Sequence, residues 1–241
     1  MSKDHYKYPR LYIESDLNDA LLPFTLNKNQ AHYLVNVMRK KSGDVIRLFN
    51  GRDGEYLCHI EGVNKKSATV RIDEKISTQP AQKRNVHLLF SPLKKNRMDF
   101  VIEKCTELGV TDFHPILTER TEVRTIKRER IEAQIIEACE QSERLNIPRL
   151  HDMQPLPQKI TQWNDSTPIM AGIERHDAPL LWEAEITGDA AFLIGPVGGL
   201  TQSERDMLIN SKTAQPISLG PNILRAETAS MVCISAAFFS S

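Results

Sequence analysis

The sequence predicts an α/β protein in which an open parallel sheet, with helices on both faces, follows a small β-barrel domain. From Val86 onward, short apolar runs alternate five times with amphipathic helical segments. Residues 44–76 instead hold three β-rich runs separated by the turn-forming stretches NGRDG and NKKS. The polar stretch STQPAQKRN lies between the two patterns and predicts a linker. We therefore expect a β-barrel domain at residues 1–77, a linker at 78–85 and an α/β domain at 86–241.

The composition is that of an ordinary globular chain. Of 241 residues, 40% are hydrophobic and 26% are charged. The apolar runs are too short to span a membrane, and the charged start MSKDHYKYPR does not resemble a signal peptide. We therefore expect a cytoplasmic protein without a membrane partner. The four cysteines are widely separated and show no CxxC or Cys/His spacing, which predicts buried thiols and no metal site.

Charge is distributed unevenly along the chain although the net charge is zero. Residues 1–150 carry a net charge of +5 and residues 151–241 carry −5. A basic part fits a polyanionic partner such as RNA, and an acidic part fits a small-ligand or subunit-contact region. The same imbalance is also compatible with an ordinary solvated surface.

The first domain contains one expected helix beside its strands. Residues 27–38 predict a short helix, because Asn27 can cap its first turn and Gln30 stands three positions later, as in a capping box. The three β-rich runs that follow predict an antiparallel meander. Together these elements indicate a compact β-barrel with one helix.

The second domain is read as five strand-helix units in succession. In open parallel sheets, ligands bind beyond the carboxyl ends of the strands, so the loops that follow the strands are candidates for function. The five units are VHLLF (86–90) before a helix from Asn96, DFHPIL (112–117) before a helix at 128–145, PIMAGI (168–173) before a helix at 178–185, AAFLIG (190–195) before a helix at 201–211, and QPISLG (215–220) before a helix at 224–239.

One of these loops, GPVGGLTQSE at residues 195–204, is rich in glycine but does not match a phosphate-binding motif. A Walker loop needs a lysine inside the motif, and the next lysine is Lys212. A dinucleotide fingerprint needs GxGxxG, which this spacing does not provide. Pro196 is rigid, and Thr201 with Glu204 forms a second capping box. The loop is suited to hold a flat ring by its backbone, although it could also merely turn the chain.

A second Gly-Pro loop, SLGPNILRAETA at residues 218–229, follows another strand and places Arg225 and Glu227 at a helix start. The two loops together resemble the signature of the SPOUT methyltransferases, and more narrowly that of the RsmE family, which methylates N3 of a uridine in 16S ribosomal RNA. PRLYIE, SPLKKNRMDFVIEKCTELGV, TERTEV and IIEACEQSERLNIPRL also resemble that family, so nearly the whole chain is covered. This chain has Val197 where the family usually has glutamate, and Asn222 where it commonly has arginine.

The resemblance implies a PUA-like β-barrel followed by a trefoil-knotted α/β domain, acting as a homodimer. It also implies S-adenosylmethionine as the cofactor, bound between the two loops. The implied cofactor-binding residues are Met170, Gly172, Leu193, Gly195, Pro196, Gly198, Gly199, Leu219, Gly220, Ile223, Leu224 and Ala229.

Methyl transfer to a uridine N3 defines what the remaining site residues have to do. The base has to be unpaired or flipped out, and its deprotonated form has to be favoured. Arg225 can stabilise the negative charge on the flanking carbonyl oxygens, and Glu227 can accept a proton or orient the arginine. Both can also simply solvate a helix start. The substrate is expected to be 16S ribosomal RNA within the assembled small subunit. Candidate RNA contacts are Arg10, Lys94, Arg97, Arg120, Arg124, Gln141 and Arg144.

Two other functions are open at this point. The chain could be a ribosome-assembly or RNA-binding protein that has kept the fold and lost catalysis, for which Val197 is the sequence hint. It could also be a SPOUT enzyme that modifies another RNA nucleotide.

Overall fold

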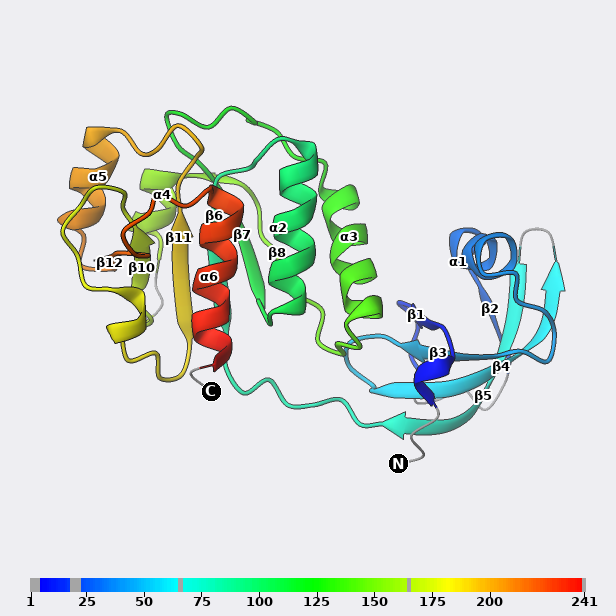
Figure 1. The fold of residues 1–241 in the computed structure, drawn as a ribbon. Coiled ribbons are helices and arrows are strands. Elements are labelled where there is room, and N and C mark those ends of the chain that lie inside the picture. The colour runs from blue at the N-terminus through cyan, green and yellow to red at the C-terminus, as the bar shows by residue number, and fades with distance from the viewer. Residues whose placement is uncertain (1–4, 18–22, 65–66, 164–165, 240–241) are drawn as a thin grey trace. The chain divides into compact units, whose positions relative to one another are not determined.

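The computed structural model describes residues 5–17, 23–64, 67–163 and 166–239. The chain divides into two compact units, one of Met1–Ala81 with Cys139–Ile147 and the other of Gln82–Ala138 with Pro148–Ser241. Residues 139–147 thus cluster with the first unit. Each unit is described by itself below, with the elements labelled in Figure 1. Among the helices of the described ranges, none is long and apolar enough to cross a membrane.

The first unit is built on a five-stranded sheet. Its strands β3 (Val45–Phe49), β4 (Glu55–Asn64) and β5 (Ser67–Ser77) form the predicted antiparallel meander. Two further short strands, β1 (Arg10–Tyr12) and β2 (Phe24–Leu26), complete the order β1-β3-β4-β5-β2, with β1 parallel to β3. The sequence did not predict these two, because three residues are too few to give an alternating pattern.

The predicted helix of the first unit is confirmed. Helix α1 (Lys28–His32) begins after Asn27, whose side chain accepts from the Gln30 backbone while the Gln30 side chain accepts from Asn27. The chain continues as one π-helical turn, η2 (Tyr33–Val37). Ala31 and Leu34 are fully buried in the apolar core beneath the sheet.

The second unit contains the predicted parallel sheet. Every strand pair in it is parallel, and its order is β12-β10-β11-β6-β7-β8, with β9 paired to β7. The strands are β6 (Val86–Phe90), β7 (Asp112–Leu117), β8 (Arg149–Leu150), β9 (Gln154–Pro155), β10 (Ile169–Gly172), β11 (Ala190–Ile194) and β12 (Ala214–Ile217). The sequence did not predict the two-residue strands β8 and β9.

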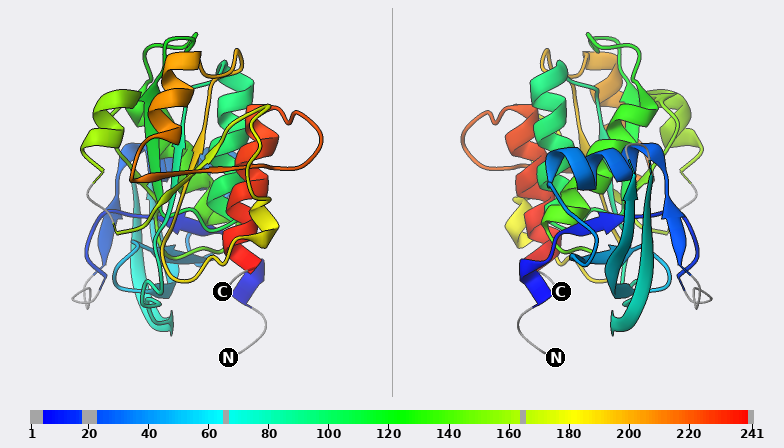
Figure 2. Two further views of the ribbon diagram at one scale, coloured as in Figure 1. Left: turned by 90° about the vertical axis from the view of Figure 1, so that its left-hand side faces the viewer. Right: turned by 90° about the vertical axis from the view of Figure 1, so that its right-hand side faces the viewer.

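Helices cover both faces of this sheet. Figures 1 and 2 place α2 (Lys95–Glu107) and α6 (Ala226–Phe239) on one face and α4 (Leu156–Thr161) and α5 (Gln202–Ile209) on the other. Helix α3 (Arg128–Gln141) lies beside α2, and Arg130 forms an ion pair with Asp99 there. Because strand side chains alternate, Leu193 joins the core under α4 and α5, and its neighbour Phe192 points to the opposite face.

The predicted helix at residues 178–185 is wrong. Only one 3-10 turn forms there, η3 (Leu181–Glu183). Leu180 is extended and bridges Ser218, whose N–H donates to the Pro179 carbonyl and whose carbonyl accepts from the Leu181 N–H, each at 2.9 Å. Pairing with a segment far along the chain uses backbone groups that a helix would need for its own first turn.

Candidate active site

A cavity of about 780 Å³ lies where three neighbouring strands of the second unit end. Gly172, Ile194 and Ile217, the last residues of β10, β11 and β12, all line it. The loops that follow these strands supply most of the wall. This is the place at which parallel α/β sheets bind ligands. Nine of the twelve expected cofactor-binding residues line the cavity, namely Gly172, Gly195, Pro196, Gly199, Leu219, Gly220, Ile223, Leu224 and Ala229.

The other three expected residues do not line the cavity. The Met170 side chain is buried within β10, and that of Leu193 packs in the core under α4 and α5 because of strand alternation. Gly198 is exposed, and its carbonyl accepts from Arg120 Nη1 at 2.9 Å. Sequence position alone could not separate the wall of the cavity from the layer behind it.

The first loop is fixed by Glu204, which is 5% exposed. Its Oε2 accepts from the Thr201 N–H at 2.9 Å, and its Oε1 accepts from the Glu119 N–H at 2.8 Å. Thr201 in turn accepts from the Glu204 N–H, so the predicted capping box is present. One buried carboxylate therefore ties the loop after β11 to the loop after β7.

Replacing Glu204 by glutamine should destabilise the second unit by about 1–3 kcal/mol, the cost of a buried hydrogen-bonding group left without its partner. The amide keeps one acceptor, so one of the two N–H groups would face an NH₂ donor. Urea unfolding followed by circular dichroism measures the change. Asp206→Asn, an exposed change on the same helix, is the control and should stay within about 0.5 kcal/mol of the parent. Equal effects of the two substitutions would refute this role of Glu204.

The second loop depends on a glycine conformation at Gly220, where φ is +113°. The Trp182 ring lies 3.6 Å from the position that a β-carbon on Gly220 would occupy. Trp182 is 64% exposed, so it covers the outside of the loop and remains open to solvent. Helix α6 then begins at Ala226, and the Ala229 N–H donates to the Arg225 carbonyl at 2.8 Å.

Arg225 and Glu227 have different surroundings, although the sequence suggested that they act together. Arg225 is exposed and lines the cavity, whereas Glu227 is not part of its lining. The Glu227 carboxylate accepts from Arg97, whose Nε lies 3.0 Å from each oxygen. Arg97 comes from α2 and also lines the cavity.

Glu227 is ionised at neutral pH. Burial acts to raise its pKa, but the hydrogen bonds from Arg97 and the charge of Arg225 outweigh burial and hold the pKa below its ordinary value. A carboxylate held in this way is a weak proton acceptor. Because Glu227 binds Arg97, we expect Glu227 to orient the Arg97 guanidinium toward the cavity.

The cavity carries an excess of positive charge that the sequence analysis largely missed. Among its described lining residues are four arginines and one glutamate: Arg97, Arg175, Arg205, Arg225 and Glu174. Glu174 and Arg175 stand in the loop shortly after β10, which ends at Gly172, and this position after a strand could have identified them. Val197 and Asn222, where the chain departs from the family pattern, are both exposed and line the same cavity.

The expected RNA contacts are spread over both units. In the first unit, Gln141 is exposed. Arg144 is partly buried, and this burial lowers the pKa of its guanidinium. In the second unit, Arg97 lines the cavity, Arg120 binds the loop at Gly198, and Lys94 and Arg124 are exposed, with Lys94 paired to Glu122 at 2.8 Å.

Arg10 does not fit the expected role as a phosphate contact. Its side chain is 2% exposed and pairs with Glu55 at 2.7 Å. It also donates to the carbonyls of Cys139 and Arg144 and lies over the Phe49 ring. Because the buried Arg10 guanidinium already binds these partners inside the first unit, it stabilises that unit and is not accessible to an RNA phosphate.

Comparison with known proteins matches both parts of the chain. The profile of an RNA methyltransferase domain matches residues 80–238, and that of an RNA methyltransferase PUA domain matches residues 26–73. The ribosomal RNA small subunit methyltransferase E of Rickettsia conorii is 33% identical over 231 residues, covering 95% of this chain and 94% of that protein. The corresponding Synechocystis protein is 32% identical, covering 88% of this chain and 71% of that protein.

Solved structures agree with these sequence matches. The crystal structure of a ribosomal RNA small subunit methyltransferase E from Neisseria gonorrhoeae, bound to S-adenosyl methionine, has a TM-score of 0.85 and 30% identity, covering 95% of this chain and 96% of that one. A Legionella pneumophila structure with the bound cofactor SAM has a TM-score of 0.84 and 28% identity, covering 96% of this chain and 97% of that one.

The parallel sheet, the two Gly-Pro loops around one cavity and the matching domain profile together define an RNA methyltransferase of the SPOUT class, with a trefoil-knotted α/β domain and a PUA-like domain before it. Within that class, the chain belongs to the ribosomal RNA small subunit methyltransferase E family, the RsmE family.

Proposed function

We propose that the protein transfers a methyl group from S-adenosylmethionine to N3 of a specific uridine in 16S ribosomal RNA. The observation that carries this proposal is the cavity at the ends of β10, β11 and β12, which lies between the two Gly-Pro loops and is lined by four arginines. Membership of the RsmE family supports the same reaction.

The residues present fit the cofactor. The cavity volume lies within the range of sites for small molecules. Gly199, at φ +70°, and Gly220 take conformations that other side chains rarely adopt, and Gly195 and Gly172 add no side chain to the wall. When bound, the cofactor supplies an electrophilic methyl group on a sulfonium. We assign the backbone of residues 195–199 and 219–224 to holding its adenosine part, with Ala229 behind them.

The arginines of the cavity fit the second reactant. A uridine that loses its N3 proton carries negative charge on the two flanking carbonyl oxygens, and fixed guanidinium groups stabilise that charge. Arg225 is the residue we assign to this task. Arg97, held by Glu227, is the second guanidinium from the neighbouring helix. In-line transfer needs mainly the correct placement of two reactants, which a rigid loop wall provides.

We infer that the active form is a homodimer and that the substrate is the assembled small subunit. Helix α6 ends in Phe238 and Phe239, which are 51% and 80% exposed, and Phe100 on α2 is 41% exposed. Phe238 and Phe239 contact each other edge to face, and exposed aromatic side chains on adjacent helices are typical of a subunit contact. As RNA contacts we keep the exposed candidates Lys94, Arg124 and Gln141, together with the PUA-like domain.

Mass spectrometry of ribosomal RNA nucleosides tests the reaction. RNA from a strain that lacks this protein should have lost 3-methyluridine from the small subunit, and the purified protein with labelled cofactor should restore it. Restoration on assembled subunits but not on naked RNA would support the particle as substrate. Binding without methyl incorporation would favour the non-catalytic alternative, and any other methylated nucleoside would favour another SPOUT activity.

A further inference from the structure

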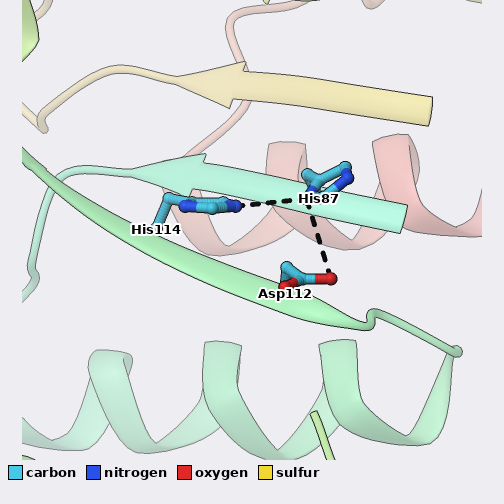
Figure 3. Close-up of side chains that lie close together, drawn as sticks. All are labelled: His87, Asp112 and His114. Carbon is cyan, nitrogen blue, oxygen red and sulfur yellow. Dashed lines mark hydrogen bonds and ion pairs between the residues drawn. The ribbon is translucent and has the colours of Figure 1, made fainter. Parts of the chain in front are cut away.

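A second cluster of chemically capable side chains lies in the same sheet, away from the cavity. His87 projects from β6, and Asp112 and His114 project from the adjacent strand β7 toward it (Figure 3). His87 is paired in register with Asp112, the first residue of β7. Both therefore lie near the amino ends of their strands, whereas the cavity lies beyond the carboxyl ends of β10, β11 and β12.

Two of the three separations between the ligand atoms are close to those of a metal site. His87 Nδ1 lies 3.1 Å from His114 Nε2 and 3.7 Å from Asp112 Oδ2, and the three atoms all fall within 4.8 Å of one another. When a metal binds nitrogen and oxygen ligands at about 2.0–2.1 Å in tetrahedral geometry, two such ligands stand roughly 3.3 Å apart. The two measured separations bracket that value.

We propose that His87, Asp112 and His114 bind a divalent transition-metal ion of the zinc type. Two imidazoles and one carboxylate are a donor set that zinc prefers, and the fourth position would take a water molecule. Residues 87 and 112–114 belong to adjacent strands, so the ion joins β6 to β7. Because the cluster lies at the other end of the strands from the methyl-transfer cavity, we assign the ion to holding β6 and β7 together and not to methyl transfer.

The surroundings provide an outer shell for the carboxylate ligand, whereas His114 Nδ1, the second ring nitrogen of that ligand, has no hydrogen-bond partner among the described residues. Asp112 Oδ1 lies 2.7 Å from His151 Nε2, and Asp112 Oδ2 accepts from the Thr111 hydroxyl at 2.7 Å. Hydrogen bonds of this kind orient a ligating carboxylate. The Trp163 ring packs edge-on against both His87 and His114, with centroid separations of 5.4 and 5.5 Å.

The cluster is buried, and one of its neighbours, His151, is partly exposed to solvent. His114 and Asp112 are 4% and 5% exposed, so a bound ion would be screened from bulk water. The His151 side chain, which stacks on His114, is 38% exposed and leads from the surface to Asp112.

Metal titration of the full-length protein tests the site. After treatment with EDTA and dialysis, the wild type should bind one Zn²⁺ per chain in calorimetry, and Co²⁺ should give the visible absorption of a tetrahedral site. Asp112→Asn and His114→Gln should each lose at least tenfold in Zn²⁺ affinity and lose the Zn²⁺-dependent rise in thermal midpoint, with circular dichroism showing that they fold. The control is His59→Gln, which removes a partly exposed histidine 2.6 Å from Asp73 in the other unit and should bind like the wild type.

X-ray absorption of the zinc-loaded wild type needs no variant to fold, and we expect two imidazole nitrogens with oxygen ligands. A sulfur shell would place the ion on cysteine and overturn the proposal. The proposal is equally overturned if the wild type binds no stoichiometric ion, if both ligand variants bind like the wild type, or if His59→Gln abolishes binding. Absence of a stoichiometric ion, or unchanged binding in both ligand variants, would identify the cluster as a hydrogen-bonded core network.

Discussion

Replacing Arg225 by alanine should lower the single-turnover rate of methyl transfer by about 10²–10³-fold, the cost typical of removing one donor that stabilises developing charge. Cofactor affinity should change less than about threefold, because the proposed task of Arg225 is toward the uridine oxygens. Enzyme in excess over small-subunit substrate, with labelled cofactor and rapid quenching, measures the rate. Calorimetry measures the affinity separately.

Two further variants sharpen this test. Arg225→Lys keeps the positive charge but loses the planar fork of donors, so it should recover only part of the rate. Arg149→Ala, which removes an exposed guanidinium on β8 of the second unit outside the cavity lining, is the control for a general loss of positive charge. An unchanged single-turnover rate in Arg225→Ala would show that this arginine only solvates the start of α6.

Replacing Gly220 by alanine should weaken cofactor binding by about 5–150-fold. At φ +113° an ordinary side chain is strained whatever the space around it, and strain of this kind costs about 1–3 kcal/mol. The loop would relax away from the conformation that forms the cavity wall. Calorimetric titration with S-adenosylmethionine measures the affinity, and the fluorescence of Trp182, which lies beside this glycine, reports the loop itself.

Gly188→Ala is the matched control. Gly188 also has a positive φ, +76°, and nothing lies within 4 Å of its β-carbon position. It should lose stability like Gly220→Ala but keep the cofactor affinity of the parent. If both substitutions lowered affinity equally, a general loss of stability would explain the result and the assignment of the 219–224 loop would be wrong.

Much of the fold follows from local patterns in the sequence. The capping boxes at Asn27 and Thr201 set helix starts through side chains only three positions away, so sequence spacing was enough to find them. The five apolar runs became strands of one parallel sheet for a similar reason, since a buried strand has to be apolar on both faces. The helix expected at 178–185 failed because Leu180 pairs with Ser218, and a local pattern does not contain its distant partner.

The same distinction holds for the site. The two Gly-Pro loops were recognisable because both follow strands, where open parallel sheets bind ligands, and because together they resemble the RsmE signature. The sequence did not reveal that Glu227 holds Arg97, which is 130 residues away, or that Arg175 and Arg205 reach the same cavity. These relations arise when helices pack on a sheet and bring separate segments to one edge.

By itself, then, the sequence determined the two-part organisation, the helix caps and the loops that mark the RsmE family. The tertiary structure decided which of the expected residues form the cavity wall, that Arg10 is buried, and that His87 meets Asp112 and His114. The physical reason is the distance along the chain between the residues that interact. Caps, turns and strand patterns depend on neighbours within a few positions, whereas strand register and helix packing set the contacts between residues far apart in the chain.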